Sequence, residues 1–199
     1  MITNPTVLNR SQNGDVHTDI FSAMLDSRSV ILTGTINDDM AASIMSQLLF
    51  LEANAPDQPI TMIINSPGGE VNAGLAIYET MRHVRCEVHT LCIGQACSMA
   101  AVLLSAGDER SILPSSRVMI HQPSGGVQGK ESDITITARE ITKIREMLVA
   151  ILSEATGKDN ETVTRDLEKD YWMSAEEAVA YGICDEVIAP QPKSRKEAN

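Results

Sequence analysis

A serine, a histidine and an aspartate in the second half of the chain are residue types that together can transfer an acyl group. Ser98 follows an expected strand that ends near Gly94 and opens an expected helix, so its hydroxyl would lie at a strand-to-helix turn. The Met99 amide, just inside the helix start, would point at a developing oxyanion. However, the surrounding Gly-Gln-Ala-Cys-Ser-Met is not the G-x-S-x-G signature, and most serines at helix starts are only N-caps. Ser98 is therefore a candidate nucleophile with a competing structural explanation.

The candidate general base is His121, which follows an expected strand over residues 117–120. Functional residues gather at the carboxyl ends of strands in parallel α/β sheets, and a histidine there can accept the proton of a serine. The other three histidines, His17, His83 and His89, lie beside polar or charged residues and are expected at the surface.

An aspartate is needed to orient the histidine and to stabilise its charged form. Asp170 follows a charged segment expected to be helical over residues 161–169. The spacing alone does not distinguish Asp170 from Asp166 or Asp185, and a solvated acid is the simplest interpretation of each when taken by itself.

The segment 65–69, Asn-Ser-Pro-Gly-Gly, is a loop between an expected strand and an expected helix. Its two glycines allow a backbone conformation that exposes an amide, as an oxyanion hole requires. Glycine-rich loops can also bind phosphate, but neither the GxxxxGK[ST] nor the GxGxxG pattern is present.

The elements that must position these residues alternate between strands and helices, which predicts βαβ units and a largely parallel sheet. The apolar runs at 29–33 and 60–64 are expected to be buried strands. Further strands are expected at 87–93, 111–113 and 117–120, and helices after Asp19, over 38–53, up to Met81 and over 98–106.

One segment does not follow this alternation. Residues 132–156 carry an apolar stripe at helical spacing that ends before Gly157, and the glycine-containing stretch 125–129 leads into it. A helix of this length is unusual in a small α/β domain. Oligomerisation through the helix is the favoured interpretation, and packing on its own domain is the alternative.

The composition excludes several classes of protein. A net charge of −11, from 27 acidic and 16 basic residues, argues against a general nucleic-acid binder. The four cysteines form no CxxC pair, which predicts neither disulfides nor a zinc site and favours a reducing compartment. No apolar run is long enough for a signal peptide or a membrane span, so we expect a cytoplasmic protein.

Four motifs together resemble the proteolytic subunit (ClpP) of the Clp protease family. They are INSPGG at 64–69, GQACSMAAVLLSAG at 94–107, RVMIHQPSGG at 117–126 and KDYWMSAEEAVAYGICDEV at 169–187. The resemblance extends from about residue 4 to about residue 188 and implies an α/β fold of the ClpP/crotonase type. It divides the chain into a flexible arm (1–18), a head (19–123 and 158–189), a handle of a strand and a long helix (124–157), and a charged tail (190–199).

The resemblance also implies site roles and partners. The nucleophile would be Ser98, the base His121 and the orienting acid Asp170. The amides of Gly69 and Met99 would form the oxyanion hole, and the peptide would lie along Gly68, Pro123, Gly125 and Gly126. Two stacked heptameric rings, formed by this chain alone or with a paralogue, would receive unfolded polypeptides from an AAA+ unfoldase of the ClpX, ClpA or ClpC type. That ATPase would use the ATP, and this chain would bind no cofactor, metal, nucleic acid or membrane.

The sequence departs from the family at the surface that usually receives the ATPase. Aromatic residues are expected there, but the matching positions are Thr61, Ile63, His83 and Ser111 near Leu113. The main hypothesis is a working serine endopeptidase. The alternative is a paralogous partner subunit of a mixed barrel, weakly active or inactive alone, that does not itself bind the ATPase. An acyl-CoA enzyme of the crotonase type would need active-site glutamates instead of the serine, histidine and aspartate.

Overall fold

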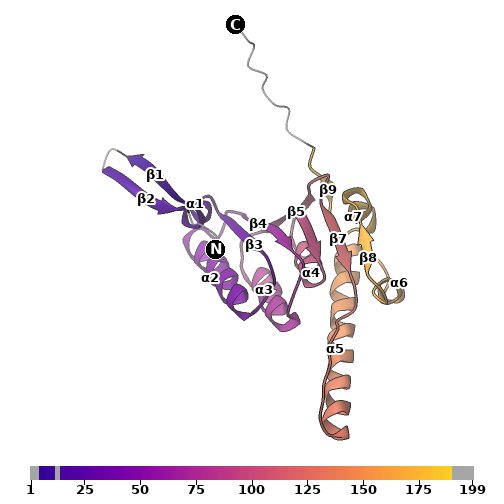
Figure 1. Cartoon of the computed structure of the whole chain (residues 1–199). Coiled ribbons are helices and arrows are strands. Elements are labelled where there is room, and N and C mark those ends of the chain that lie inside the picture. The colour runs from indigo at the N-terminus through magenta and orange to yellow at the C-terminus, as the bar shows by residue number, and fades with distance from the viewer. Residues whose placement is uncertain (1–4, 12–13, 190–199) are drawn as a thin grey trace.

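The computed structural model describes residues 5–11 and 14–189 (Figure 1). The expected charged tail, residues 190–199, therefore lies outside the described residues, as do the first four residues of the expected arm. In the described part of the arm, β1 (Thr6–Ser11) and β2 (Gly14–Asp19) pair as an antiparallel hairpin that stands away from the head. The sequence did not predict these two strands.

The head is built on a seven-stranded, mostly parallel sheet, as expected from the alternation of elements. Its order is β3-β4-β5-β6-β9, with β7 also paired to β5 and β8 paired antiparallel to β7. The strands are β3 (Ser29–Thr33), β4 (Ile60–Ser66), β5 (Val88–Cys97), β6 (Arg110–Ile112), β7 (Arg117–Ile120), β8 (Tyr171–Met173) and β9 (Glu186–Val187).

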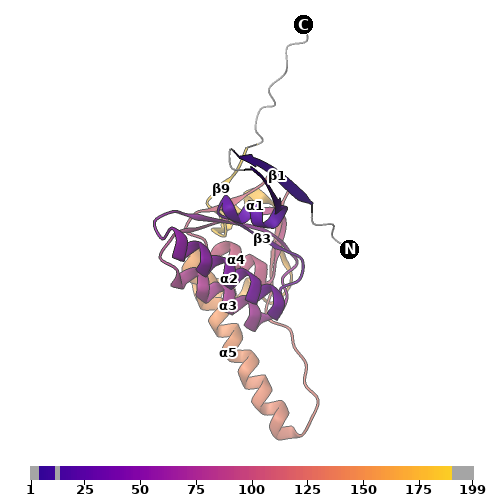
Figure 2. The same ribbon diagram turned by 90° about the vertical axis from the view of Figure 1, so that its left-hand side faces the viewer.

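Three helices pack together against one face of the sheet, as the two views show (Figures 1 and 2). They are α2 (Asp38–Asn54), α3 (Val71–His83) and α4 (Met99–Ser105). On β3 and β4 every second residue is buried and the residues between them are half-buried or exposed. The expectation that these strands are buried was therefore wrong for alternate residues, because helices cover only one face of the sheet.

Local signals set several helix boundaries. The short helix α1 (Ile20–Asp26) begins at Asp19, whose carboxylate accepts two backbone hydrogen bonds, and α2 begins at Asn37, which accepts one from Met40. The expected helix over 161–169 is shorter, because α6 (Asn160–Asp166) ends before Leu167. A further helix, α7 (Ala175–Tyr181), starts with a capping box at Ser174 and was not predicted.

The long helix α5 (Glu131–Thr156) protrudes from the head, as expected for a handle (Figure 1). Its buried residues, Leu148, Val149 and Leu152, all lie in the half that packs on the head, whereas Ile134 and Ile136 near its free end are exposed. The chain from residue 121 to 130 forms no strand. The expected strand of the handle is therefore absent in the single chain, where no neighbouring strand supplies hydrogen bonds to it.

Within the residues that the structure describes, no helix is both long and apolar enough to span a membrane.

Candidate active site

Ser98 occupies a strained turn between β5, which ends at Cys97, and α4, which begins at Met99. Its φ of 56° and ψ of −124° are unusual for a residue with a side chain and cost on the order of 1–3 kcal/mol. Hydrogen bonds hold the turn on both sides, since the Ser98 amide donates to the Met119 carbonyl (2.7 Å) and the Ser98 carbonyl accepts from Ala101 (2.9 Å). The Ser98 side chain does not cap α4, so its hydroxyl is available for another partner.

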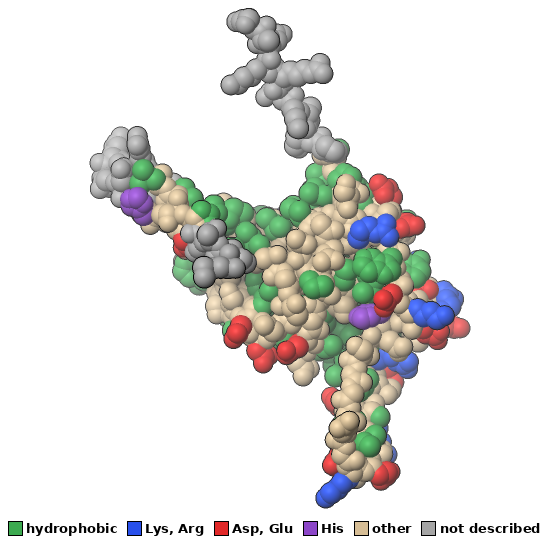
Figure 3. All heavy atoms as spheres, viewed as in Figure 1, with side chains coloured by type: hydrophobic (Ala, Val, Ile, Leu, Met, Phe, Trp, Pro, Cys, Tyr) green, Lys and Arg blue, Asp and Glu red, His purple; other side chains and the backbone are tan. Residues whose placement is uncertain are grey.

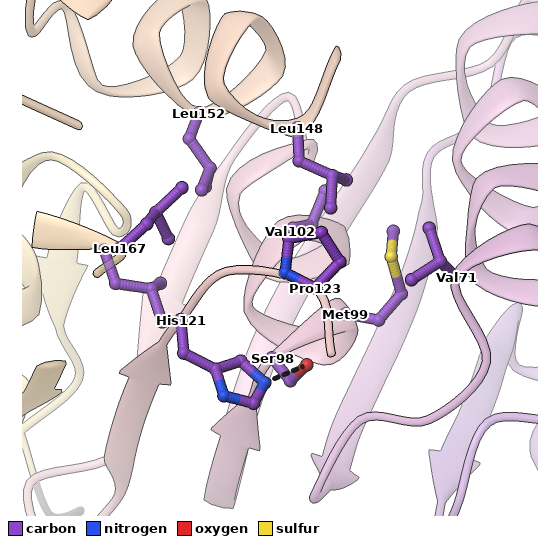
Figure 4. Close-up of a pocket in the computed structure, with 10 residues that line it drawn as sticks. Val71, Ser98, Met99, Val102, His121, Pro123, Leu148, Leu152 and Leu167 are labelled. Atoms are coloured by element: carbon purple, nitrogen blue, oxygen red, sulfur yellow. Dashed lines mark hydrogen bonds between the residues drawn. The ribbon is translucent and has the colours of Figure 1, made fainter. Parts of the chain in front are cut away.

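That partner is His121, which follows the carboxyl end of β7 (Figure 4). The distance from His121 Nε2 to Ser98 Oγ is 2.8 Å. Parallel pairing of β5 with β7, with Cys97 opposite Met119, brings the ends of the two strands together. The sequence placed Ser98 and His121 at the ends of two strands, and the sheet makes these two strands neighbours.

The structure places Asp170 on the other side of the imidazole, with Oδ1 at 3.2 Å from His121 Nδ1. Strand β8 runs antiparallel to β7, and Ile120 pairs with Tyr171, so the residues that flank this pair, His121 and Asp170, face each other. A hydrogen bond of 2.8 Å from the Gln122 amide to the Leu167 carbonyl holds the two segments together.

The other two candidate aspartates have different partners. Asp166 accepts a hydrogen bond of 3.0 Å from the hydroxyl of Tyr181. Asp185 pairs with Arg110, and the hydrogen bond from this guanidinium holds the pKa of the Asp185 carboxyl below its usual value. Of the three candidate aspartates, which sequence spacing did not distinguish, Asp170 is the one that the structure pairs with His121, and the other two pair elsewhere.

The glycine loop lies directly against the turn at Ser98. Gly68 has a φ of +90°, and a Cβ there would lie 2.5 Å from the Cys97 carbonyl oxygen and 2.7 Å from Ser98 Cβ. A Cβ on Gly69 would lie 2.1 Å from the Ile36 carbonyl oxygen. Only glycine fits at either position. The close approach places Gly68 at the start of α4, where its Cβ would lie 3.1 Å from the Met99 nitrogen, and Gly69 is the next residue in the chain. The Met99 amide is the first of that helix, where amides have no acceptor within the helix.

Ser66 holds this loop in place through hydrogen bonds of its side chain. Its side chain is fully buried, and its hydroxyl donates to the Gly34 carbonyl (2.6 Å) and accepts from the Gly68 amide (3.0 Å). One buried hydroxyl therefore joins the glycine loop to the end of β3. Sequence reasoning placed Ser66 in the loop but assigned it no role.

An apolar pocket opens beside Ser98 and His121 (Figure 4). It lies between α3, α4 and the base of α5, and the chain at Pro123 passes across it. Apart from the residues already predicted for the site, its lining residues were missed: Val71, Val102, Ile120, Leu148, Leu152 and Leu167. The signal that could have found two of them is the i, i+4 pair Leu148 and Leu152 on the head-facing stripe of α5.

Of the four residues predicted to contact the peptide, two lie at the serine or its pocket and two do not. Gly68 touches the turn at Ser98, and Pro123 lines the pocket. Gly125 and Gly126 are exposed and do not line the pocket, and a Cβ on Gly125 would lie 3.4 Å from the side chain of Ile141 on α5. Gly125 thus lies beside the handle helix and not at Ser98, and a Cβ on Gly126 would meet nothing within 4 Å.

The neighbouring cysteines do not compete with Ser98 as nucleophiles. All four cysteines are free and buried. Burial raises the pKa of the Cys97 thiol, with a further contribution from the negative charge of Asp170, and burial raises the pKa of Cys92 to about 12. Both are neutral thiols near pH 7, and the thiolate is the reactive form.

The remaining histidines take no part in the site. His17 and His83 are exposed as expected, whereas His89 is only half-exposed and lies between Glu87 (3.2 Å) and Glu109 (3.5 Å). Among the residues that the structure describes, no three histidine, cysteine or acidic side chains are grouped so that they could hold a metal ion.

One comparison with known proteins matches almost the whole chain. The sequence model of a protein family described as Clp protease aligns with residues 12–191, a span that includes the strained serine turn, the histidine, the aspartate and the glycine loop.

Proposed function

Since the chain belongs to the Clp protease family, we propose that it is a serine endopeptidase subunit in which Ser98, His121 and Asp170 are the catalytic triad. The observation that carries this proposal is the continuous line of hydrogen bonds from Asp170 through His121 to the Ser98 hydroxyl. The strained backbone of Ser98 is a second support, because such strain is concentrated at functional sites.

In this mechanism the Ser98 oxygen attacks the carbonyl carbon of the scissile peptide bond while His121 Nε2 takes the hydroxyl proton. Asp170 stabilises the imidazolium that forms and keeps the ring oriented. The proton then passes to the leaving amine, the C–N bond breaks, and an acyl-enzyme remains. A water molecule gives its proton to His121 and attacks the ester, which releases the acid and restores the serine.

The negative charge on the tetrahedral oxygen would be stabilised by the amides of Gly69 and Met99. This assignment is supported by the contact between the glycine loop and the serine turn, and by the position of Met99 at the start of α4. Loss of one such donor typically costs about 3 kcal/mol in the barrier.

The apolar pocket favours peptides with an aliphatic or aromatic residue on the acyl side of the scissile bond. Side chains on three helices enclose it, and none of the residues that line it is an aspartate, glutamate, lysine or arginine. An acidic or basic side chain would lose its hydration there without gaining a partner.

We further propose assembly into two stacked heptameric rings fed by an AAA+ unfoldase, with polypeptides as substrates in the cytoplasm. The exposed apolar residues Ile134, Ile136 and Met147 on α5 support assembly through the handle. Pairing between rings would also supply the missing partner for the extended segment 125–129.

A second candidate function, a paralogous subunit of a mixed barrel that does not bind the ATPase, is favoured by the open face of the sheet. One row across this face consists of Ile31, Ile63, Leu91 and Ser111, which are paired in register and only half-buried. Hydrophobic side chains gather on this side of the head in the space-filling view, away from α2 and α3 (Figure 3). The row contains no aromatic side chain to anchor a docking loop.

The test is cleavage of a short fluorogenic peptide by the purified protein, with sedimentation of the same sample and Ser98→Ala as control. Turnover that depends on Ser98 in a barrel-sized particle supports a self-sufficient peptidase. A silent particle that becomes active only after mixing with a paralogue supports the second candidate. Turnover that persists in Ser98→Ala contradicts the assignment of the nucleophile.

A further inference from the structure

Gly74 is a buried residue inside α3, where a glycine needs its own explanation. In a helix interior, glycine costs about 1 kcal/mol relative to alanine. Gly74 has ordinary helical geometry, since it is not among the residues with positive φ, and its amide donates to the Glu70 carbonyl at 3.0 Å. The backbone therefore does not require glycine at this position.

The reason for the glycine is the side chain of Met99. A Cβ on Gly74 would lie 2.1 Å from Met99 Cγ, 3.0 Å from its sulfur and 3.1 Å from its terminal methyl group. The clash begins at the middle of the side chain, so a rotation of the terminal methyl group alone does not relieve it. Met99 is 2% exposed, and all of its side chain beyond Cβ lies against α3 at Gly74.

Met99 is also a wall of the apolar pocket, opposite the leucines of α5 (Figure 4). Because Met99 is almost fully buried and lines the pocket, we expect a Met99 side chain displaced from α3 to move into the space of the pocket. The space beside Gly74 and the space available to a substrate side chain are thus connected through one flexible residue.

We propose that Gly74 determines the specificity of the site. Because Gly74 has no Cβ, the Met99 side chain can lie against α3, and this position of Met99 sets the size of the acyl-side residue that the pocket accepts. This inference rests on the proposed peptidase function. Gly74 does not touch the reacting atoms, and it acts through Met99.

The experiment compares wild-type protein with Gly74→Ala, in the assembled form, on peptides that differ only in an alanine, leucine or phenylalanine on the acyl side of the bond. We expect kcat/KM for the leucine and phenylalanine peptides to fall about tenfold or more, as for a pocket that loses the volume of a methylene group or two. The alanine peptide should change by less than about threefold. In Gly74→Ala/Met99→Ala the preference for large residues should return, because the shortened side chain no longer fills the pocket.

An equal loss for all three peptides would overturn the inference, because it would mean that the oxyanion hole and not the pocket had changed. An unchanged profile would overturn it as well. Thermal unfolding gives a readout that is independent of catalysis. Gly74→Ala should lower Tm when Met99 is present and raise it, or leave it unchanged, in the Met99→Ala background. Absence of this coupling contradicts the contact itself. Failure of the proposed function would look different, since wild-type protein would then cleave none of the peptides while the coupling in Tm persisted.

Discussion

Replacing Ser66 by alanine should reduce turnover strongly although Ser66 touches no substrate. The hydroxyl is fully buried and makes two hydrogen bonds, to the Gly34 carbonyl and from the Gly68 amide. Ser66→Ala removes both bonds and leaves the buried Gly68 amide without this partner, whereas Gly34 is exposed and its carbonyl can turn to water. The unpaired Gly68 amide costs about 1–3 kcal/mol, which favours a shift of the loop that gives this amide a new partner.

Any shift of Gly68 moves the adjacent Gly69 amide, the proposed oxyanion donor. If that donor is lost, kcat should fall by about a hundredfold or more, whereas KM should change by only a few-fold, because the interaction is made in the transition state. The assay is the initial rate on a fluorogenic peptide over a range of concentrations, with Tm measured on the same samples.

Ser105→Ala is the matched control. Ser105 is also a buried serine, and its hydroxyl donates to the Val102 carbonyl (2.9 Å) within α4, away from the glycine loop. This variant should lose some stability but keep kcat within about threefold of wild type. The reasoning is refuted if Ser66→Ala keeps its kcat, or if both variants lose kcat in proportion to their loss of Tm.

Three further results are expected. Asp170→Asn should lower kcat by about 10⁴-fold, because the histidine loses the acid that sets its tautomer. The kcat of the control Asp166→Asn should stay within a few-fold of wild type, and equal losses in the two variants would contradict the assignment of Asp170 as the acid. The four cysteines, all buried, should resist a thiol reagent in the native protein at pH 7 and react only after unfolding, as counted by mass spectrometry. Rapid native labelling would contradict the burial of all four and the raised pKa values of Cys92, Cys97 and Cys184. Arg110 lowers the pKa of Asp185 in the folded state, so their pairing stabilises the protein above the unfolded pKa of about 3.9 and this stabilisation is lost as the pH falls through the folded pKa. Asp185→Asn should therefore lower Tm at pH 7, and the difference in Tm from wild type should shrink in acid. A difference in Tm that grows in acid would contradict the lowered pKa of Asp185 in the folded state.

The sequence alone predicted the features that depend on local chemistry. The strand over residues 29–33 and the strand before His121 were placed correctly, since runs of apolar residues between turn signals favour strands wherever they lie. The helix expected over 38–53 also began where the sequence placed it, because the Asn37 side chain satisfies the free amide of Met40. The serine turn and the glycine loop were recognised for the same reason, because backbone freedom and helix starts are properties of a few adjacent residues.

Only the tertiary structure decided which of these residues meet. The choice of Asp170 over Asp166 depends on the antiparallel register of β7 and β8. The Ser98 hydroxyl does not cap α4, because the backbone angles of Ser98 are not those of a capping residue, and it bonds to His121 instead. The pocket needs the base of α5 packed on the head. The fit of Met99 beside α3 cannot be read from the sequence, where Met99 lies 25 positions after Gly74. Register, side-chain direction and packing are set by contacts between distant segments, and the local pattern of one segment does not contain them.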